Sequence, residues 1–206
     1  MNDPIQKKLP DPALLDFGLD RSGMGYRLEN MGGVILIRPL PSTQANQQQP
    51  ELWKKPHGIF KESRRGRGDW TFSVPLPDPW QIKLPLYSGL LRLHVRPSPS
   101  GQVGIFLEQL SQWQWLSEKT PEGSRVLSLF AHSGAATLAL AQAGAEVVHV
   151  DSSRQALQLA RKNATASGLN DASIRWICED AQRFVTRERT RGNTYDCLLY
   201  TSDAAD

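Results

Sequence analysis

The stretch from Val126 to Asp151 constrains the fold more than any other part of the chain. It reads V-L-S-L-F-A-H-S-G-A-A-T-L-A-L-A-Q-A-G-A-E-V-V-H-V-D, the pattern of a strand, a small-residue turn, an alanine-rich helix stopped by glycine, and a second strand ending in a carboxylate. This pattern predicts a parallel βαβ unit. A carboxylate in that position accepts hydrogen bonds from both ribose hydroxyls in many proteins, so the segment points to a nucleoside-bearing cofactor.

Similar elements continue towards residue 200. We expect strands at Val126–Phe130, Glu146–Val150, Ile174–Cys178 and Tyr195–Tyr200, and helices at Ala135–Ala143, Arg154–Ser167 and Ala181–Thr190. Strands that alternate with helices predict an α/β fold with a Rossmann-like, doubly wound parallel sheet, here a partial one of about four strands. Apolar residues at helical spacing from Phe106 to Leu116 predict an amphipathic helix that leads into this sheet.

The preceding part of the chain has a different pattern. Short strand-like pieces, separated by prolines and glycines, predict a small antiparallel β-rich region over residues 1–122. These pieces are Gly33–Pro39, Trp70–Val74, Trp80–Leu84 and Leu90–Val95. Residues 42–50 have no apolar face and predict a flexible connector. The partial cofactor-binding domain is expected over residues 123–196.

Composition limits the classes of protein to which the chain can belong. With 206 residues, 39% of them hydrophobic, the chain can bury a sizeable core, and its net charge of +3 does not by itself require a nucleic-acid partner. Its two cysteines lie too far apart to suggest a stapled secreted fold. There is no charged-then-apolar leader and no apolar run near the roughly 18 residues that cross a bilayer. We therefore expect a cytoplasmic protein with no membrane partner, and the spacing of the histidines predicts no metal site.

The turn after the first strand of the βαβ unit decides between cofactors. It holds a single glycine, Gly134, which makes a poor cradle for a dinucleotide pyrophosphate. It suits a ligand whose amino-acid carboxylate meets the unpaired amides of the next helix, and S-adenosylmethionine is such a ligand. The alternatives are a plain tight turn, a helix-capping role for Asp151, and an N-cap role for Asp180 in place of, or together with, contact to the adenine amine.

These residues resemble the class I S-adenosylmethionine-dependent methyltransferases. The L-F-A-H-S-G-A-A-T-L-A turn is similar to the branch that contains bacterial ribosomal RNA base methyltransferases, and the resemblance covers residues 101–196 well. The cofactor-binding residues that it implies are Gln109, Phe130, His132, Ser133, Gly134, Asp151 and Asp180. The turn would bind the methionine part, Asp151 the ribose and Asp180 the adenine. Asn163 also matches the family, and we expect a structural role for it in its helix.

The chain departs from that family after Tyr195-Asp196. Relatives continue into a D-P-P-(Lys/Ala/Ser)-F loop that packs on the target base, whereas this chain reads T-S-D-A-A-D over residues 201–206. Cys197–Asp206 matches an in-frame translation of a transposon-type sequencing adapter, so we expect a C-terminally truncated reading frame with a non-native tail; the alternative is a divergent C-terminus. The catalytic residues are therefore unknown. Cys178 is expected to be a small core residue rather than a nucleophile.

The resemblance also implies the order of the sheet. The family order is 3-2-1-4-5-7-6, of which this chain would retain 3-2-1-4, leaving the fourth strand as an open edge. We expect such a chain to aggregate or to remain partly folded when it is expressed alone.

Three hypotheses for function follow. The first is an S-adenosylmethionine-dependent methyltransferase acting on a nucleobase in ribosomal RNA. The others are a nicotinamide-dependent Rossmann-type reductase and a non-catalytic S-adenosylmethionine- or RNA-binding fragment. The basic stretch over residues 54–70 is a candidate RNA contact, although such runs are often solvated loops. The sequence leaves the oligomeric state open.

Overall fold

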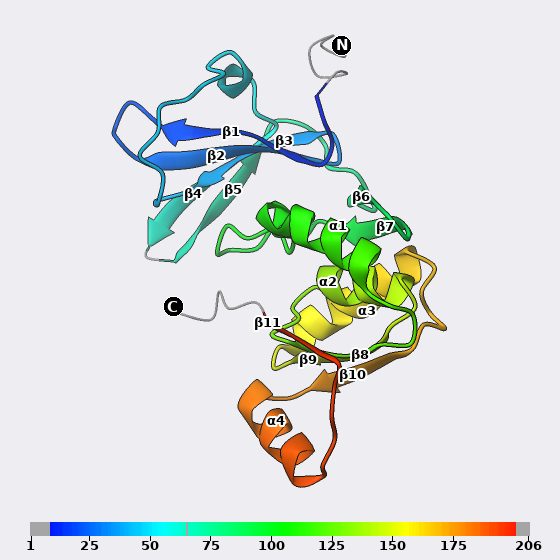
Figure 1. Cartoon of the computed structure of the whole chain (residues 1–206). Coiled ribbons are helices and arrows are strands. Elements are labelled where there is room, and N and C mark those ends of the chain that lie inside the picture. Colours follow the sequence, from blue (N-terminus) through cyan, green and yellow to red (C-terminus); the bar gives the residue numbers. More distant parts are fainter. Residues whose placement is uncertain (1–8, 65, 201–206) are drawn as a thin grey trace. The chain divides into compact units, whose positions relative to one another are not determined.

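The chain forms two compact units in a computed structural model that describes residues 9–64 and 66–200. One unit comprises residues 1–83 and 94–108, and the other comprises residues 84–93 and 109–206 (Figure 1). The boundary passes through a hairpin formed by β6 (Gln81–Leu86) and β7 (Gly89–His94).

The first unit is built on a five-stranded sheet in the order β1-β2-β3-β4-β5. The strands are β1 (Ala13–Leu19), β2 (Gly25–Met31), β3 (Val34–Pro39), β4 (Gly58–Arg64) and β5 (Arg67–Phe72), and a short 3-10 helix, η2 (Leu52–Lys54), precedes β4. All neighbouring pairs are antiparallel except β3 and β4, which are parallel. The β-rich region expected from the sequence is therefore confirmed, with three further strands, β1, β2 and β4, that the sequence pattern did not predict.

A buried ion pair interrupts the apolar pattern of β2. Glu29 and Arg38 are only 1% and 2% exposed, and the Arg38 guanidinium donates from Nε and Nη2 to the two Glu29 carboxylate oxygens at 2.6 and 2.9 Å. Arg38 Nη1 also donates to the Gly101 carbonyl at 3.1 Å. The two charges compensate each other, and the hydrogen bond from Arg38 to Gly101 holds the segment around residue 101 against β3.

The segment predicted as a flexible connector is fixed along β1. Asp16, in β1, accepts hydrogen bonds from the backbone amides of Gln48 and Gln49 and from Trp53 Nε1, at 2.8 to 3.0 Å. The amide of Leu19 donates to the Ala45 carbonyl at 2.9 Å. A polar, proline-bounded sequence can therefore be ordered here because one carboxylate gathers its amide donors.

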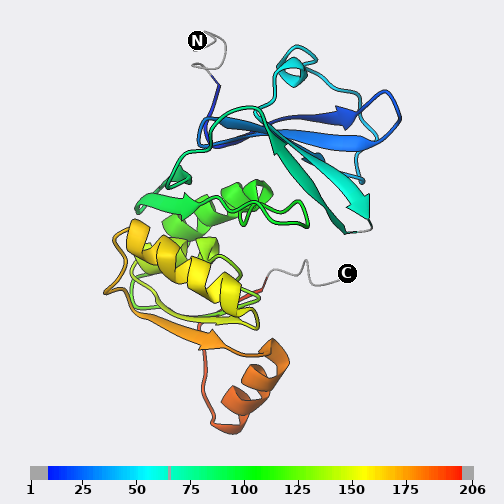
Figure 2. The same cartoon turned by 180° about the vertical axis from the view of Figure 1, so that it is seen from behind.

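The second unit alternates helices with parallel strands. After a 3-10 turn, η3 (Leu107–Gln109), its elements are α1 (Leu110–Lys119), β8 (Arg125–Leu129), α2 (Ala135–Gln142), β9 (Glu146–Asp151), α3 (Arg154–Ala166), β10 (Ile174–Cys178), α4 (Ala181–Thr190) and β11 (Cys197–Tyr200). The sheet order is β10-β9-β8-β11, all parallel, which is the order 3-2-1-4 that the family resemblance implies. Figures 1 and 2 show α2 and α3 on one face of this sheet and α4 on the other.

Alternate residues of the central strands divide between two cores. Val126 and Val147 pack with Leu140 of α2 and Leu116 of α1 on one face. On the other face, apolar residues of β8 and β9 pack with Phe184 of α4. Burial on both faces is what a continuous run of aliphatic residues predicts for a central parallel strand.

One side-chain expectation in this unit is wrong. Cys178 is exposed rather than part of the core, because it lies at the end of β10, an edge strand of the sheet among the described residues. Helix α1 buries Trp113, but Trp115, two residues further on, is 60% exposed because it lies on a different side of the helix.

The suspect C-terminal segment lies partly outside the described residues. Cys197–Tyr200 form β11, which pairs in parallel with Val126–Leu129 of β8. Residues 201–206 are not among the described residues. The suggestion that Cys197–Asp206 is not native sequence therefore stays a prediction.

Candidate cofactor site

The turn between β8 and α2 has an unusual backbone. Phe130 and His132 have φ angles of 51° and 45°, in the left-handed region that residues with a side chain seldom occupy. Gly134, the N-cap of α2, has a φ of 83°. Backbone strain of this kind concentrates at ligand-binding and catalytic turns, where the surrounding structure maintains it.

Asp151 holds this turn against the end of β9. Its Oδ2 accepts the amide of His132 and its Oδ1 accepts the amide of Ser153, both at 2.8 Å. An ionised carboxylate has about four lone-pair positions, so each oxygen can accept one more hydrogen bond. The sequence-predicted turn and the sequence-predicted acid are thus brought together at the carboxyl ends of β8 and β9, with the Asp151 side chain half-buried.

A second contact fixes the turn from α3. The Asn163 side chain is fully buried and donates from Nδ2 to the Ser133 carbonyl at 2.9 Å. Ser133 is itself 3% exposed. The structural role expected for Asn163 is therefore observed, and it consists of fastening the loop that precedes α2.

The first turn of α2 has no side-chain cap. Its N-cap is Gly134, whereas Ser153 caps α3 by accepting the Ala156 amide and Asp180 caps α4 by accepting the Arg183 amide. The first amides of an α-helix have no partner within the helix and favour an anion. The residues present therefore fit a ligand that brings a carboxylate to α2 and hydroxyl groups to Asp151.

Asp180 lies on the same edge of the sheet. Cys178 is paired in register with Asp151, and Asp180 follows two residues later. Its Oδ1 accepts the Arg183 amide at 2.9 Å, so the N-cap alternative considered from the sequence is observed. Its side chain is exposed, which leaves its second oxygen accessible, and the adenine contact stays a prediction.

Gln109 and Phe130 are less closely tied to this site. Phe130 is 41% exposed and follows β8, at the start of the strained turn. Gln109 is the residue immediately before α1. Their roles in lining the pocket stay predictions.

The sequence did not indicate a buried polar pair that lies beside the turn. His149 of β9 and Thr137 of α2 are both fully buried, and His149 Nδ1 lies 3.0 Å from Thr137 Oγ1. Burial lowers the pKa of His149 to about 4, with His132 and Arg161 acting in the same direction and Asp151 opposing them. The sequence signal was available: one threonine in an alanine-rich helix and one histidine in a valine-rich strand, both at core-facing positions.

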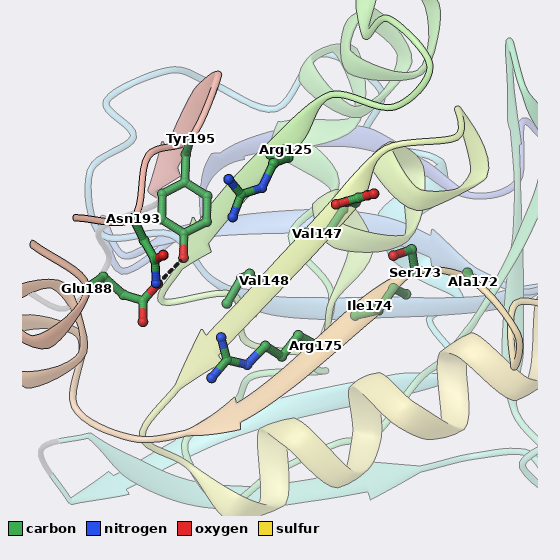
Figure 3. A pocket seen from close by; sticks show the side chains of 11 residues that line it. Arg125, Val147, Val148, Ala172, Ser173, Ile174, Arg175, Glu188, Asn193 and Tyr195 are labelled. Carbon is green, nitrogen blue, oxygen red and sulfur yellow. Dashed lines mark hydrogen bonds between the residues drawn. The ribbon is translucent and has the colours of Figure 1, made fainter. Parts of the chain in front are cut away.

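A separate hollow lies at the opposite ends of the strands. It has a volume of about 490 Å³, and Arg125, Glu146 and Ile174, the first residues of β8, β9 and β10, line it together with Glu188 and Tyr195 (Figure 3). The Tyr195 hydroxyl donates to Glu188 at 2.5 Å; burial, with this bond, raises the pKa of Tyr195 to about 12. Ligands of open parallel sheets bind at the carboxyl ends of the strands, so this hollow is not the cofactor site.

The part of the chain that the structure describes holds neither a metal site nor a membrane-spanning helix. Over the described ranges, no group of three or more His, Cys, Asp or Glu side chains could hold a metal ion. Within the same ranges, no helix is long and apolar enough to cross a membrane.

Comparison with known proteins agrees with this geometry. Residues 126–203 match a family model described as a methyltransferase domain. The chain is similar to the ribosomal RNA large subunit methyltransferase I of Aeromonas hydrophila, with 32% identity over 99 residues that cover 48% of this chain and 25% of that protein. The protein of the same name from Erwinia tasmaniensis is 29% identical over 130 residues, which cover 63% of this chain and 33% of that one.

A solved structure extends the similarity to nearly the whole chain. The S-adenosylmethionine-dependent methyltransferase from Agrobacterium tumefaciens is 35% identical, with a TM-score of 0.81, over 93% of this chain and 60% of that one. The curated relatives are longer: the chain spans only about a quarter to a third of their length.

The fold, the turn and the comparisons together identify residues 126–203 as a methyltransferase domain, similar to that of S-adenosylmethionine-dependent methyltransferases of class I. Among proteins of this class, the chain resembles the ribosomal RNA large subunit methyltransferases. The family resemblance, the fold class and the cofactor predicted from the sequence are thereby confirmed.

Proposed function

We propose that this chain binds S-adenosylmethionine at the carboxyl ends of β8 and β9 and that its activity is methyl transfer to a nucleobase in ribosomal RNA. The observation that carries the proposal is the hydrogen bond from the His132 amide to Asp151. It joins the turn that would receive the amino-acid carboxylate to the acid that would bind the ribose. Both features then serve one ligand.

Each residue has a defined task in this proposal. The uncapped amides of α2 receive the methionine carboxylate, and Asp151 uses its remaining lone pairs for the ribose hydroxyls. Asp180 uses its second oxygen for the adenine amine. Gln109 and Phe130 complete the pocket. When bound, the cofactor supplies an electrophilic sulfonium methyl group, and the protein contributes chiefly by aligning it with the acceptor.

Two observations favour this ligand over a nicotinamide cofactor. The turn offers one glycine, where a pyrophosphate needs several close backbone approaches. The matched family model and the Agrobacterium structure are both methyltransferases.

The proposal that ribosomal RNA accepts the methyl group has its own support, independent of the cofactor site. Both curated relatives are named for ribosomal RNA of the large subunit. In the first unit, the hairpin of β4 and β5 carries exposed Lys61 and Arg67. Cations on an exposed hairpin can contact a phosphate backbone.

The cofactor part of the proposal is tested by calorimetry with S-adenosylmethionine and with NADH. Wild-type chain should bind S-adenosylmethionine and not NADH. Asp151→Asn should weaken that binding by about tenfold or more, because it removes one acceptor and the charge. Asp171→Asn, the same change at an exposed site in the loop before β10, is the matched control and should bind as the wild type does. Binding of NADH alone would refute the proposal.

The transfer part is tested with S-adenosylmethionine carrying a radiolabelled methyl group. Label should appear in large-subunit ribosomal RNA and not in a transfer RNA control. A chain that binds the cofactor but labels neither RNA would instead support the binding-fragment alternative.

A further inference from the structure

The pair formed by Thr137 and His149 connects the cofactor turn to the centre of the sheet. His149 lies two residues before Asp151 in β9, and Thr137 is the third residue of α2. The 3.0 Å contact between His149 Nδ1 and Thr137 Oγ1 therefore joins the strand that ends in the ribose acid to the helix turn that would hold the carboxylate. Neither side chain is exposed at all.

The imidazole also lies beneath the turn itself. A Cβ atom placed on Gly134 would lie 3.7 Å from His149 Cε1. The ring also packs against Trp176 of β10, with centroids 4.8 Å apart. The ring thus fills the space between the turn, α2 and the neighbouring strand.

One ring nitrogen of His149 makes this arrangement costly for the stability of the fold. Within the described residues, His149 Nε2 is buried and has no hydrogen-bond partner. A buried polar atom without a partner destabilises a fold, whereas two apolar groups of the same shape are neutral or stabilising. The low pKa of His149 keeps the ring neutral near pH 7, with Asp151 of β9, His132 of the turn and Arg161 of α3 as the charged or titratable groups that act on it. A polar pair that does not favour stability, at a ligand-binding turn, calls for a functional explanation.

We propose that Thr137 and His149 act as positioning residues, which hold the turn over residues 131–134 and the first turn of α2 in the conformation that binds the methionine end of S-adenosylmethionine. The inference rests on the proposed function. It predicts that the pair contributes to cofactor affinity while lowering the stability of the fold.

The test replaces the pair by apolar residues of similar shape. Thr137→Val, His149→Phe and the double variant are compared with wild type for thermal unfolding and for binding of S-adenosylmethionine and of adenosine. The double variant should have an equal or higher Tm. Its affinity for S-adenosylmethionine should fall by about tenfold, while its affinity for adenosine, which lacks the methionine part, changes by less than about threefold. His149→Asn places an amide near the Nδ1 position, so its affinity for S-adenosylmethionine should be higher than that of His149→Phe.

The outcomes separate the inference from the proposed function. If wild type binds adenosine but not S-adenosylmethionine, the proposed function fails. If wild type binds both, and the variants lose both equally or neither, the inference alone is wrong. A lower Tm with unchanged ligand affinities would mean a purely structural pair. If His149→Phe does not fold, Thr137→Val serves as the test, because it removes the hydrogen bond with little change of shape. A loss of affinity for S-adenosylmethionine but not for adenosine would then support the inference, and an equal loss or no loss would refute it.

Discussion

At Gly134 two independent requirements exclude a side chain. The φ of 83° lies in the left-handed region, and a Cβ there would lie 2.9 Å from the Cβ of Ala160 in α3. Glycine lets α3 approach the turn closely enough for Asn163 to reach the Ser133 carbonyl. The single glycine is therefore explained by the packing of the turn, whatever ligand it binds.

Gly134→Ala should destabilise the second unit by about 2–4 kcal/mol, the sum of backbone strain and overpacking against α3. Gly168→Ala is the control, because its φ is 73° but nothing lies within 4 Å of the added Cβ. That variant should lose only the backbone term, about 1–2 kcal/mol. Chemical denaturation of both variants measures the difference. Equal losses would show that the contact with Ala160 contributes nothing.

Among the elements, the segment between β3 and β4 depends most on a single side chain. Burial alone would raise the pKa of Asp16, but the hydrogen bonds from Trp53, Gln49, Gln48 and Phe17 outweigh burial and lower it below its usual value of 3.8. When the pKa of a carboxyl group is lower in the folded state than in the unfolded chain, its ionisation stabilises the folded state at pH values above the pKa of the unfolded chain. That stability is lost as the pH falls through the folded pKa.

Asp16→Asn should therefore lower the stability of the first unit at pH 7 by about 1–3 kcal/mol. The difference from wild type should shrink as the pH falls below about 4, because the wild-type carboxyl then becomes protonated too. Denaturant unfolding followed by tryptophan fluorescence at several pH values measures this, with the exposed Asp78→Asn as control. A difference that stays constant down to pH 2 would contradict the charged role of Asp16.

The elements also show which parts of the fold the sequence could predict. β8 and β9 have aliphatic residues on both faces and were predicted to within a residue or so. β1 was missed because its pattern is inverted: Asp16 is buried among hydrogen-bond donors, while Phe17 is 43% exposed. β2 was missed because Glu29 is buried against Arg38. Both depend on partners distant in sequence, which local periodicity does not contain.

The site divides in the same way. The turn, Asp151 and Asp180 follow from the order of strand, turn and acid, which is local. The His132–Asp151 bond and the Thr137–His149 contact depend on how the turn and α2 pack against β9. The sequence marks the polar residues at these positions, and the structure shows which of them pair.

For the whole molecule, the open side of the parallel sheet matters most. β11 has a neighbour on one side only among the described residues, and it carries Leu198 and Tyr200, which are 54% and 64% exposed. β10, the other edge, contains Arg175, and a charged residue protects an edge strand from pairing with another chain. β11 has no charge between Cys197 and Tyr200.

Wild-type chain should therefore associate with rising concentration, and it should do so through β11. Leu198→Lys places a charge on this edge strand and should reduce association by about tenfold or more, since pairing with a second chain would desolvate the ammonium group and remove no apolar surface at that position. Leu76→Lys makes the same change at an exposed leucine outside the sheets and should associate as wild type does. Sedimentation velocity over a range of concentrations measures both variants. A wild-type chain that stays monomeric throughout, and unfolds in one sharp transition, would mean that the exposed edge is not a site of association.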